Sequence, residues 1–270
     1  MVRDGAAVTL PRGRAGVLLA VLAMSAGRPV SAGRLAGLIW DGDQPEHSRA
    51  RLHTVVARLR GLVPGAVVTA GDGYLLGVDP DRVDVLRFRR LVREAGEAGE
   101  PGAALGLLGR ALGLWRGEPL ADLRSAALDR EVVPGLTDEY LSAVQRRAGL
   151  ELAAGRYDRV VGELRGLVGR YPLREPLWGQ LIRALAAAGR PAEAIGEYHR
   201  VRQTLAEQLG LDPSAELREL YRLLLDAGRP GGSGPRSPGS FAERSPAADG
   251  AEADGAEAEG EETESEETES

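Results

Sequence analysis

Four arginines within one short segment are the residues of this chain with the clearest chemistry. They are Arg49, Arg51, Arg58 and Arg60, and residues 48–63 contain no acidic side chain. A guanidinium group holds a phosphate, or the edge of a guanine base, through two parallel hydrogen bonds. A helix that only faces water usually mixes glutamate with arginine, because oppositely charged i,i+4 pairs stabilise it. The segment therefore favours contact with a polyanion, and a solvated basic face is the alternative interpretation.

Helical spacing sorts this segment into an apolar face and an outer face. At 100° per residue, five aliphatic residues fall on one side, four small residues fall on the other, and the arginines lie along the margins. The aliphatic residues are Leu52, Val55, Val56, Leu59 and Val63, and the small ones are Ala50, Thr54, Ala57 and Gly61. An outer face of small residues lets a helix enter the major groove of DNA, where flanking arginines reach phosphates and His53 and Thr54 reach base edges. The predicted DNA contacts of this helix are Arg49, Arg51, His53, Thr54, Arg58 and Arg60.

Two further helices and a β-hairpin are predicted around this segment. Helical patterns cover residues 11–26, starting at a proline, and residues 31–40, where Ser31 is a suitable N-cap. Two apolar runs flank a Gly-Asp-Gly turn within residues 67–76, which predicts a hairpin. A short strand is expected at residues 7–10. Three helices followed by a hairpin is the order of a winged helix-turn-helix.

Three residues outside the third helix are further candidates for DNA contact. Gly73 and Tyr74 belong to the predicted wing, and Arg14 lies near the start of the first helix. For Tyr74 we favour packing beneath the wing, because it belongs to an apolar run. Arg14 is equally well explained as an ordinary surface arginine.

An internal repeat marks the helical region that follows. Ala154-Gly155-Arg156 recurs 34 residues later as Ala188-Gly189-Arg190, and a looser copy begins at Ala98. A period of 34 residues is typical of tetratricopeptide (TPR) helix-turn-helix units. Chance similarity among Ala/Leu/Arg-rich helices is the weaker alternative.

The predicted fold is mostly α and has three parts. A winged-helix DNA-binding domain covers residues 1–79, an all-α TPR-like domain covers 80–228, and a Gly/Pro/Ser linker with an acidic tail covers 229–270. The last part carries 3 arginines and 12 acidic residues, whereas residues 1–76 carry 9 arginines and 5 acidic residues. With so little to bury, the tail is expected to be disordered. It either solvates the chain or folds back on the basic helix as an electrostatic brake.

Several classes of function are disfavoured by composition. The chain has no cysteine, and its three histidines are scattered, so no metal site or other cofactor is predicted. We find no phosphate-binding loop, nucleophile elbow or dinucleotide fingerprint, so an enzyme is not expected. No signal peptide or membrane span is visible, which favours a cytoplasmic protein with no membrane partner.

Several segments, in order along the chain, resemble the SARP regulators, the antibiotic regulatory proteins of actinomycetes. Residues 38–43 (Leu-Ile-Trp-Asp-Gly-Asp) are similar to the family's exit from the second helix, and residues 56–60 (Val-Ala-Arg-Leu-Arg) to the end of its recognition helix. Residues 73–76 (Gly-Tyr-Leu-Leu) look like the wing. Residues 83–88 (Val-Asp-Val-Leu-Arg-Phe) and 207–213 (Glu-Gln-Leu-Gly-Leu-Asp-Pro) resemble parts of the activator domain.

The resemblance implies an OmpR-type winged helix joined to a bacterial transcriptional activator domain. It implies an activator that binds direct repeats in promoters of secondary-metabolite gene clusters, self-associates there, and recruits RNA polymerase. Two departures from the family are visible: its usual first strand, Phe-x-x-Leu-Gly-Pro-Leu, is not found, and residues 50–51 read Ala-Arg where Asn-Ala is common. The alternative is a TPR-like interaction scaffold with a degenerate winged helix.

Overall fold

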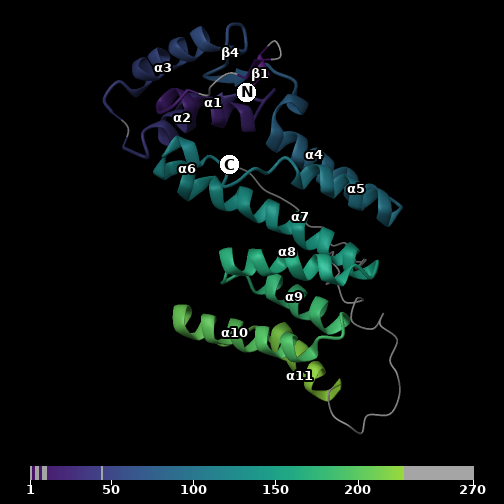
Figure 1. Cartoon of the computed structure of the whole chain (residues 1–270). Helices are drawn as coiled ribbons and strands as arrows, with labels where there is room; N and C mark the ends of the chain where they lie inside the picture. Colours follow the sequence, from purple (N-terminus) through teal and green to yellow (C-terminus); the bar gives the residue numbers. More distant parts are fainter. Residues whose placement is uncertain (1, 4–5, 8–10, 44, 228–270) are drawn as a thin grey trace, which may run out of the picture.

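The computed structural model describes residues 2–3, 6–7, 11–43 and 45–227. Figure 1 shows an elongated molecule, with a small α/β unit at one end and a stack of helices that extends from it to α11 at the other end. The mostly α class predicted from the sequence is confirmed. The expected acidic tail, and residues 8–10 of the expected first strand, lie outside the described residues.

A winged helix forms the N-terminal unit. Its helices are α1 (Arg14–Met24), α2 (Ala32–Ile39) and α3 (Ser48–Leu62). Its sheet strands are β3 (Val30–Ser31), β4 (Val67–Ala70) and β5 (Gly73–Leu76). A separate antiparallel pair is formed by β1 (Val2–Arg3) and β2 (Ala6–Ala7). The sheet order is β3-β5-β4, and all pairs are antiparallel. The predicted hairpin is confirmed, with Gly71 at a φ of +58° in its two-residue turn.

Local signals set the ends of the first two helices. Ser31 Oγ accepts a hydrogen bond from Arg34 N at 3.3 Å, so the predicted N-cap of α2 is confirmed. The start of α1 differs from the prediction, because the helix begins at Arg14 and not at Pro11. Gly13 sits at a φ of +64°, a left-handed conformation that interrupts helical geometry between Pro11 and Arg14.

The helical stack follows η1 (Pro80–Arg82). Its elements are α4 (Asp84–Glu97), α5 (Pro101–Leu112), η2 (Ala121–Leu123), α6 (Ala126–Glu131), α7 (Val133–Ala153), α8 (Tyr157–Arg170), α9 (Glu175–Ala187), α10 (Pro191–Leu209) and α11 (Ala215–Ala227). The turns α7–α8 and α9–α10 have the same geometry, with Gly155 at +74° and Gly189 at +72°. The predicted repeat therefore corresponds to a repeated turn. Gly99, in the looser copy, has no positive φ.

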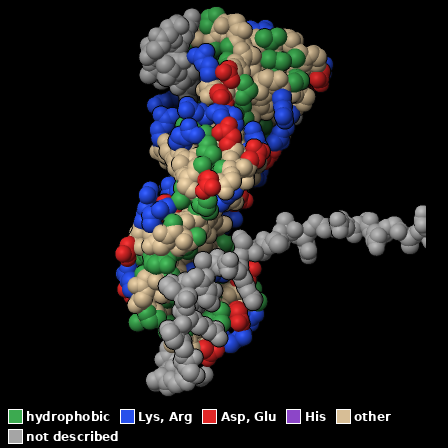
Figure 2. All heavy atoms as spheres, turned by 90° about the vertical axis from the view of Figure 1, so that its right-hand side faces the viewer, with side chains coloured by type: hydrophobic (Ala, Val, Ile, Leu, Met, Phe, Trp, Pro, Cys, Tyr) green, Lys and Arg blue, Asp and Glu red, His purple; other side chains and the backbone are tan. Residues whose placement is uncertain are grey.

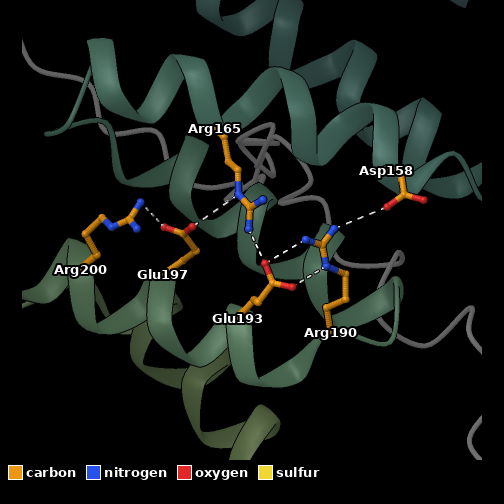
Figure 3. A network of polar contacts seen from close by, with 6 residues as sticks. All are labelled: Asp158, Arg165, Arg190, Glu193, Glu197 and Arg200. Atoms are coloured by element: carbon orange, nitrogen blue, oxygen red, sulfur yellow. Dashed lines mark hydrogen bonds and ion pairs between the residues drawn. The ribbon is translucent and has the colours of Figure 1, made fainter.

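An ion-pair network joins α8 to α10 and to the turn before it (Figure 3). Arg165 of α8 lies 2.5 Å from Glu193 and 3.7 Å from the buried Glu197, both on α10. Glu193 also accepts hydrogen bonds from Arg190 at 2.7 and 2.8 Å. Hydrogen bonds from Arg190, and to a smaller extent from Arg165, lower the pKa of Glu193 to about 2.

This low pKa predicts a pH-dependent contribution to stability. The Glu193→Gln variant should melt below the wild type at neutral pH, because only the carboxylate holds both arginines. A lowered folded-state pKa gives stability that is present above the ordinary value of 4.5 and is lost as the pH falls towards about 2. Melting temperatures of both proteins across this range should therefore converge. Glu97→Gln, at the exposed end of α4, is the control and should show no such convergence.

The α6 helix docks onto the winged helix and joins the two parts. Its Ala127 and Leu128 are buried in the same cluster as the core of α1, α2 and α3. Asp41, just after α2, accepts hydrogen bonds through Oδ1 from Ala127 N at 2.7 Å and Ser125 Oγ at 3.2 Å. A carboxylate at the first turn of a helix satisfies its free N–H groups. Asp41 therefore caps α6 across the interface.

We expect Asp41→Ala to lower the free energy of unfolding by about 2 kcal/mol, the usual loss for hydrogen bonds to a charged group. Asp41 also has a φ of +53°, which alanine tolerates poorly. Asp41→Asn is the matched control, because asparagine adopts this conformation and keeps an accepting oxygen, and it should cost less than about 1 kcal/mol. Urea unfolding of the three proteins measures the difference; equal losses for both variants would contradict the capping role.

Candidate nucleic-acid interface

Helix α3 lies at the outer end of the winged helix (Figure 1), and its two faces are as predicted. Leu52, Val56 and Leu59 are 0–1 % exposed, and they pack against α1 and α2. The small residues of the opposite face are exposed: Ala50, Thr54, Ala57 and Gly61. Apolar anchoring on one side thus leaves a shallow surface on the other.

The arginines along this surface are exposed and unengaged. The side chains of Arg49, Arg51 and Arg58 form no hydrogen bond or ion pair with any residue in the described part of the chain. Arginines of the helical stack are commonly paired; Arg89, for example, holds Glu139 through two hydrogen bonds of 2.7 Å, which raise the pKa of Arg89. On the face drawn in Figure 2, basic and acidic side chains lie intermixed over the stack. Unpaired cations on an acid-free helix are suited to an external anion.

Comparison with known proteins identifies the family of this chain. A profile of the bacterial transcriptional activator domain matches residues 83–225. The regulatory protein DnrI of Streptomyces peucetius is 32 % identical over 239 residues, which cover 83 % of this chain and 88 % of DnrI. The chain belongs to the SARP family of transcriptional regulators.

Longer relatives share the same region with this SARP chain. The transcriptional regulatory protein EmbR of Mycobacterium tuberculosis is 34 % identical over 235 residues, or 83 % of this chain, which spans 61 % of the length of EmbR. A solved structure of Mycobacterium tuberculosis EmbR in complex with a low affinity phosphopeptide superposes with a TM-score of 0.76 at 32 % identity. The match covers 89 % of this chain and 64 % of that one. The fold is therefore that of EmbR over the shared region.

The structure gives Arg60 partners within the chain. Its Nε donates a hydrogen bond to Val67 O at 3.0 Å, and its Nη2 donates one to Thr69 Oγ1 at 2.9 Å. The guanidinium group also lies 5.9 Å from the centroid of the Tyr74 ring. Arg60 of this SARP regulator therefore fastens the end of α3 to β4. We assign it to positioning the wing and leave it out of the DNA-contacting set.

Gly73 and Tyr74 also have structural roles in the SARP winged helix. Tyr74 is 6 % exposed, as expected for packing beneath the wing, and its ring meets His53 edge-on at 6.3 Å. Gly73 is buried beside β3, where an added Cβ would lie 2.0 Å from Val30 O. Because both are buried, we leave them out of the proposed interface.

Three other predicted residues lie at the surface or its margin. Thr54 is exposed, and its Oγ1 lies 3.4 Å from Ala50 O of the same helix, a weak hydrogen bond that leaves the hydroxyl available. His53 is exposed apart from its contact with Tyr74. The Arg14 guanidinium carbon lies 5.7 Å from the centroid of the Trp40 ring, a contact that explains this residue through packing.

Sequence reasoning missed the connection between the recognition helix and the helical stack. Asp41 lies seven residues before α3 and caps α6, and Arg34 of α2 pairs with Glu131 of α6 at 2.5 Å. A partial signal was present, because Ser125 followed by Ala-Ala-Leu has the form of a helix start. The partner of that cap was not recognisable, since it lies 86 residues away.

Among the described residues no group of three His, Asp or Glu side chains is placed to hold a metal ion. None of the helices in residues 11–227 is both long enough and apolar enough to cross a bilayer.

Proposed function

We propose that this SARP regulator binds double-stranded promoter DNA by placing α3 in the major groove. The observation that carries the proposal is the acid-free outer face of α3, with Arg49, Arg51 and Arg58 exposed at its margins and without partners in the described residues. A helix of this shape fits a groove about 12 Å wide, where its flanks meet both phosphate walls.

The contacts divide by type in this proposal. Arg49, Arg51 and Arg58 bind phosphates and set the position of the helix, which gives affinity without sequence preference. His53 and Thr54 lie toward the N-terminal half of α3 and read base edges. The wing, held to α3 by Arg60, adds backbone contacts beside the groove.

Further parts of the proposal rest on the family. We propose that the protein activates a secondary-metabolite gene cluster from direct repeats in the promoter, with copies side by side. The helical stack presents the surface for RNA polymerase, as helical repeats commonly do for protein partners. These events take place on the chromosome in the cytoplasm.

A footprint on the promoters that flank its own gene tests this function. We expect protection of two repeated sequences in the same orientation, and stimulated transcription from that promoter with purified polymerase. Affinity should fall steeply with salt, because displaced counterions drive binding. If folded protein retards no fragment even at about 50 mM salt, where electrostatic binding is strong, the protein acts as an interaction scaffold instead.

A further inference from the structure

We propose that the acidic segment at residues 251–270 of this chain binds the arginine-edged face of α3 and competes there with DNA. This inference rests on the proposed function, because it describes the regulation of the same surface. The occupant, residues 251–270, lies outside the described part of the chain.

Residues 251–270 are a polyanion of simple composition. They contain ten acidic residues and no arginine, and their only apolar side chains are four alanines. Such a segment has little apolar area to bury, so any surface that holds it must do so through cations. The alternative to a specific site, a purely solvating segment, predicts no preferred surface at all.

Helix α3 matches this segment better than any other described helix. It carries four arginines and no acid, and three of these arginines have no partner in residues 11–43 and 45–227. The other acid-free helices α1, α2 and α5 carry only one arginine each. Exposed arginines of the last two helices have acids beside them: Arg202 shares α10 with Glu193, Glu197 and Glu207, and Arg218 shares α11 with Glu216 and Glu219. Those carboxylates repel a polyanion, so the attraction is strongest at α3.

Covalent geometry allows the contact within one chain. Successive helix contacts lead from α11 through α9, α7, α6 and α2 to α3. At about 8–10 Å between the axes of a packed pair, these five steps amount to about 40–50 Å, to which offsets along the helix axes add. Residues 228–250 span up to about 75 Å when extended. The acidic segment can therefore reach α3 while α11 stays in place.

Competition of this kind has a distinctive dependence on salt. The contact is a set of exposed ion pairs, which are screened as the Debye length falls below about 10 Å above 0.1 M salt. The segment should thus weaken DNA binding at low salt and have little effect at high salt. The wild type should consequently show a shallower fall of affinity with salt than a chain whose acidic segment is neutral.

The first test uses the full chain with all ten acids of residues 251–270 replaced by Gln or Asn. We expect it to bind the promoter fragment about five- to tenfold more tightly than the wild type at low salt, the gain from removing a tethered weak competitor. The two affinities should converge at high salt. A full chain with residues 251–270 in scrambled order keeps the charge and should bind like the wild type. Equal affinity of the neutral and wild-type chains at low salt would overturn the inference.

The second test needs no DNA and locates the segment. Because the chain has no cysteine, dyes can be placed by the pair Gly61→Cys and Gly260→Cys. Gly61 is at the end of α3, where an added Cβ meets open space. Energy transfer should be high in dilute buffer, and it should fall with salt and on replacing Arg49, Arg51 and Arg58 by alanine.

A matched pair distinguishes α3 from the rest of the surface. Gly196 of α10 also faces open space, and α10 packs against α11, after which the segment begins. Gly196→Cys with Gly260→Cys should therefore give transfer that is low in dilute buffer and rises with salt, as the segment leaves α3. Transfer that is high at Gly196 in dilute buffer and falls with salt, with low transfer at Gly61, would place the segment elsewhere and overturn the inference. Energy transfer between positions 61 and 260 in a protein that binds no promoter would support the contact between the acidic segment and α3, but it would reject the proposed function. Failure of the inference and failure of the proposed function are therefore distinguishable.

Discussion

Replacing Arg49, Arg51 and Arg58 together by alanine should lower the affinity for promoter DNA by about 100- to 1000-fold at 0.1 M salt. Each phosphate contact contributes a slope of about −0.9 to the dependence of log affinity on log salt, so three contacts give a factor of this size. The plot for the variant should be shallower by about three. Fluorescence anisotropy with a labelled promoter fragment across a salt series measures both quantities.

A matched control separates this effect from a general loss of positive charge. Arg110, Arg202 and Arg218 are exposed, lie on α5, α10 and α11, and form no ion pair in the described residues. Their triple replacement by alanine removes the same charge and should change affinity less than about threefold, since these sites lie well beyond a Debye length from α3. Equal losses in both triple variants would show that binding follows net charge and not α3.

Gly73→Ala should have the largest effect on stability. An added Cβ would lie 2.0 Å from Val30 O and 2.9 Å from Ser31 Cα, both backbone atoms of the paired strand β3. Backbone atoms cannot rotate away, so β3 must separate from β5, with the loss of its ladder hydrogen bonds. We expect the free energy of unfolding to fall by about 3–4 kcal/mol, the range for severe overpacking. Urea unfolding of the full chain measures this.

Gly77→Ala is the control for this prediction, because it adds the same methyl group one residue beyond β5. Its nearest neighbour would be Ala66 O at 3.7 Å, an ordinary contact. We expect a change below about 1 kcal/mol, since glycine-to-alanine exchange at an unstrained site is small. If Gly73→Ala were as mild as Gly77→Ala, the close approach of β3 to β5 would be wrong.

Features set by nearby residues could be predicted from the sequence. The buried and exposed faces of α3 follow from spacing within 16 residues, and the Ser31 cap and the Gly71 turn depend on neighbours at most three positions away. The repeat was visible because Gly155 and Gly189 each supply the left-handed residue that ends a helix. These features depend on residues close together in the sequence, so they can be predicted without knowing the tertiary fold.

Features set by distant partners could not be predicted. Strand β3 is two residues long and exists because it pairs with Tyr74 and Gly73. Arg60 has the spacing of a DNA contact, yet β4 captures its guanidinium group through Val67 and Thr69. Helical periodicity shows which side of a helix a side chain occupies, but it does not show which acceptor folds next to it.

The most direct test of the account is to place a DNA-cleaving reagent on the outer face of α3. Thr54→Cys supplies the only thiol of the chain, to which an iron chelate can be attached. We expect strand cleavage within the protected repeats of a bound promoter, and none there when the same reagent is carried by Gly196→Cys on α10. Footprinted DNA that is left uncut by the reagent at position 54 would show that another surface of the protein contacts the duplex.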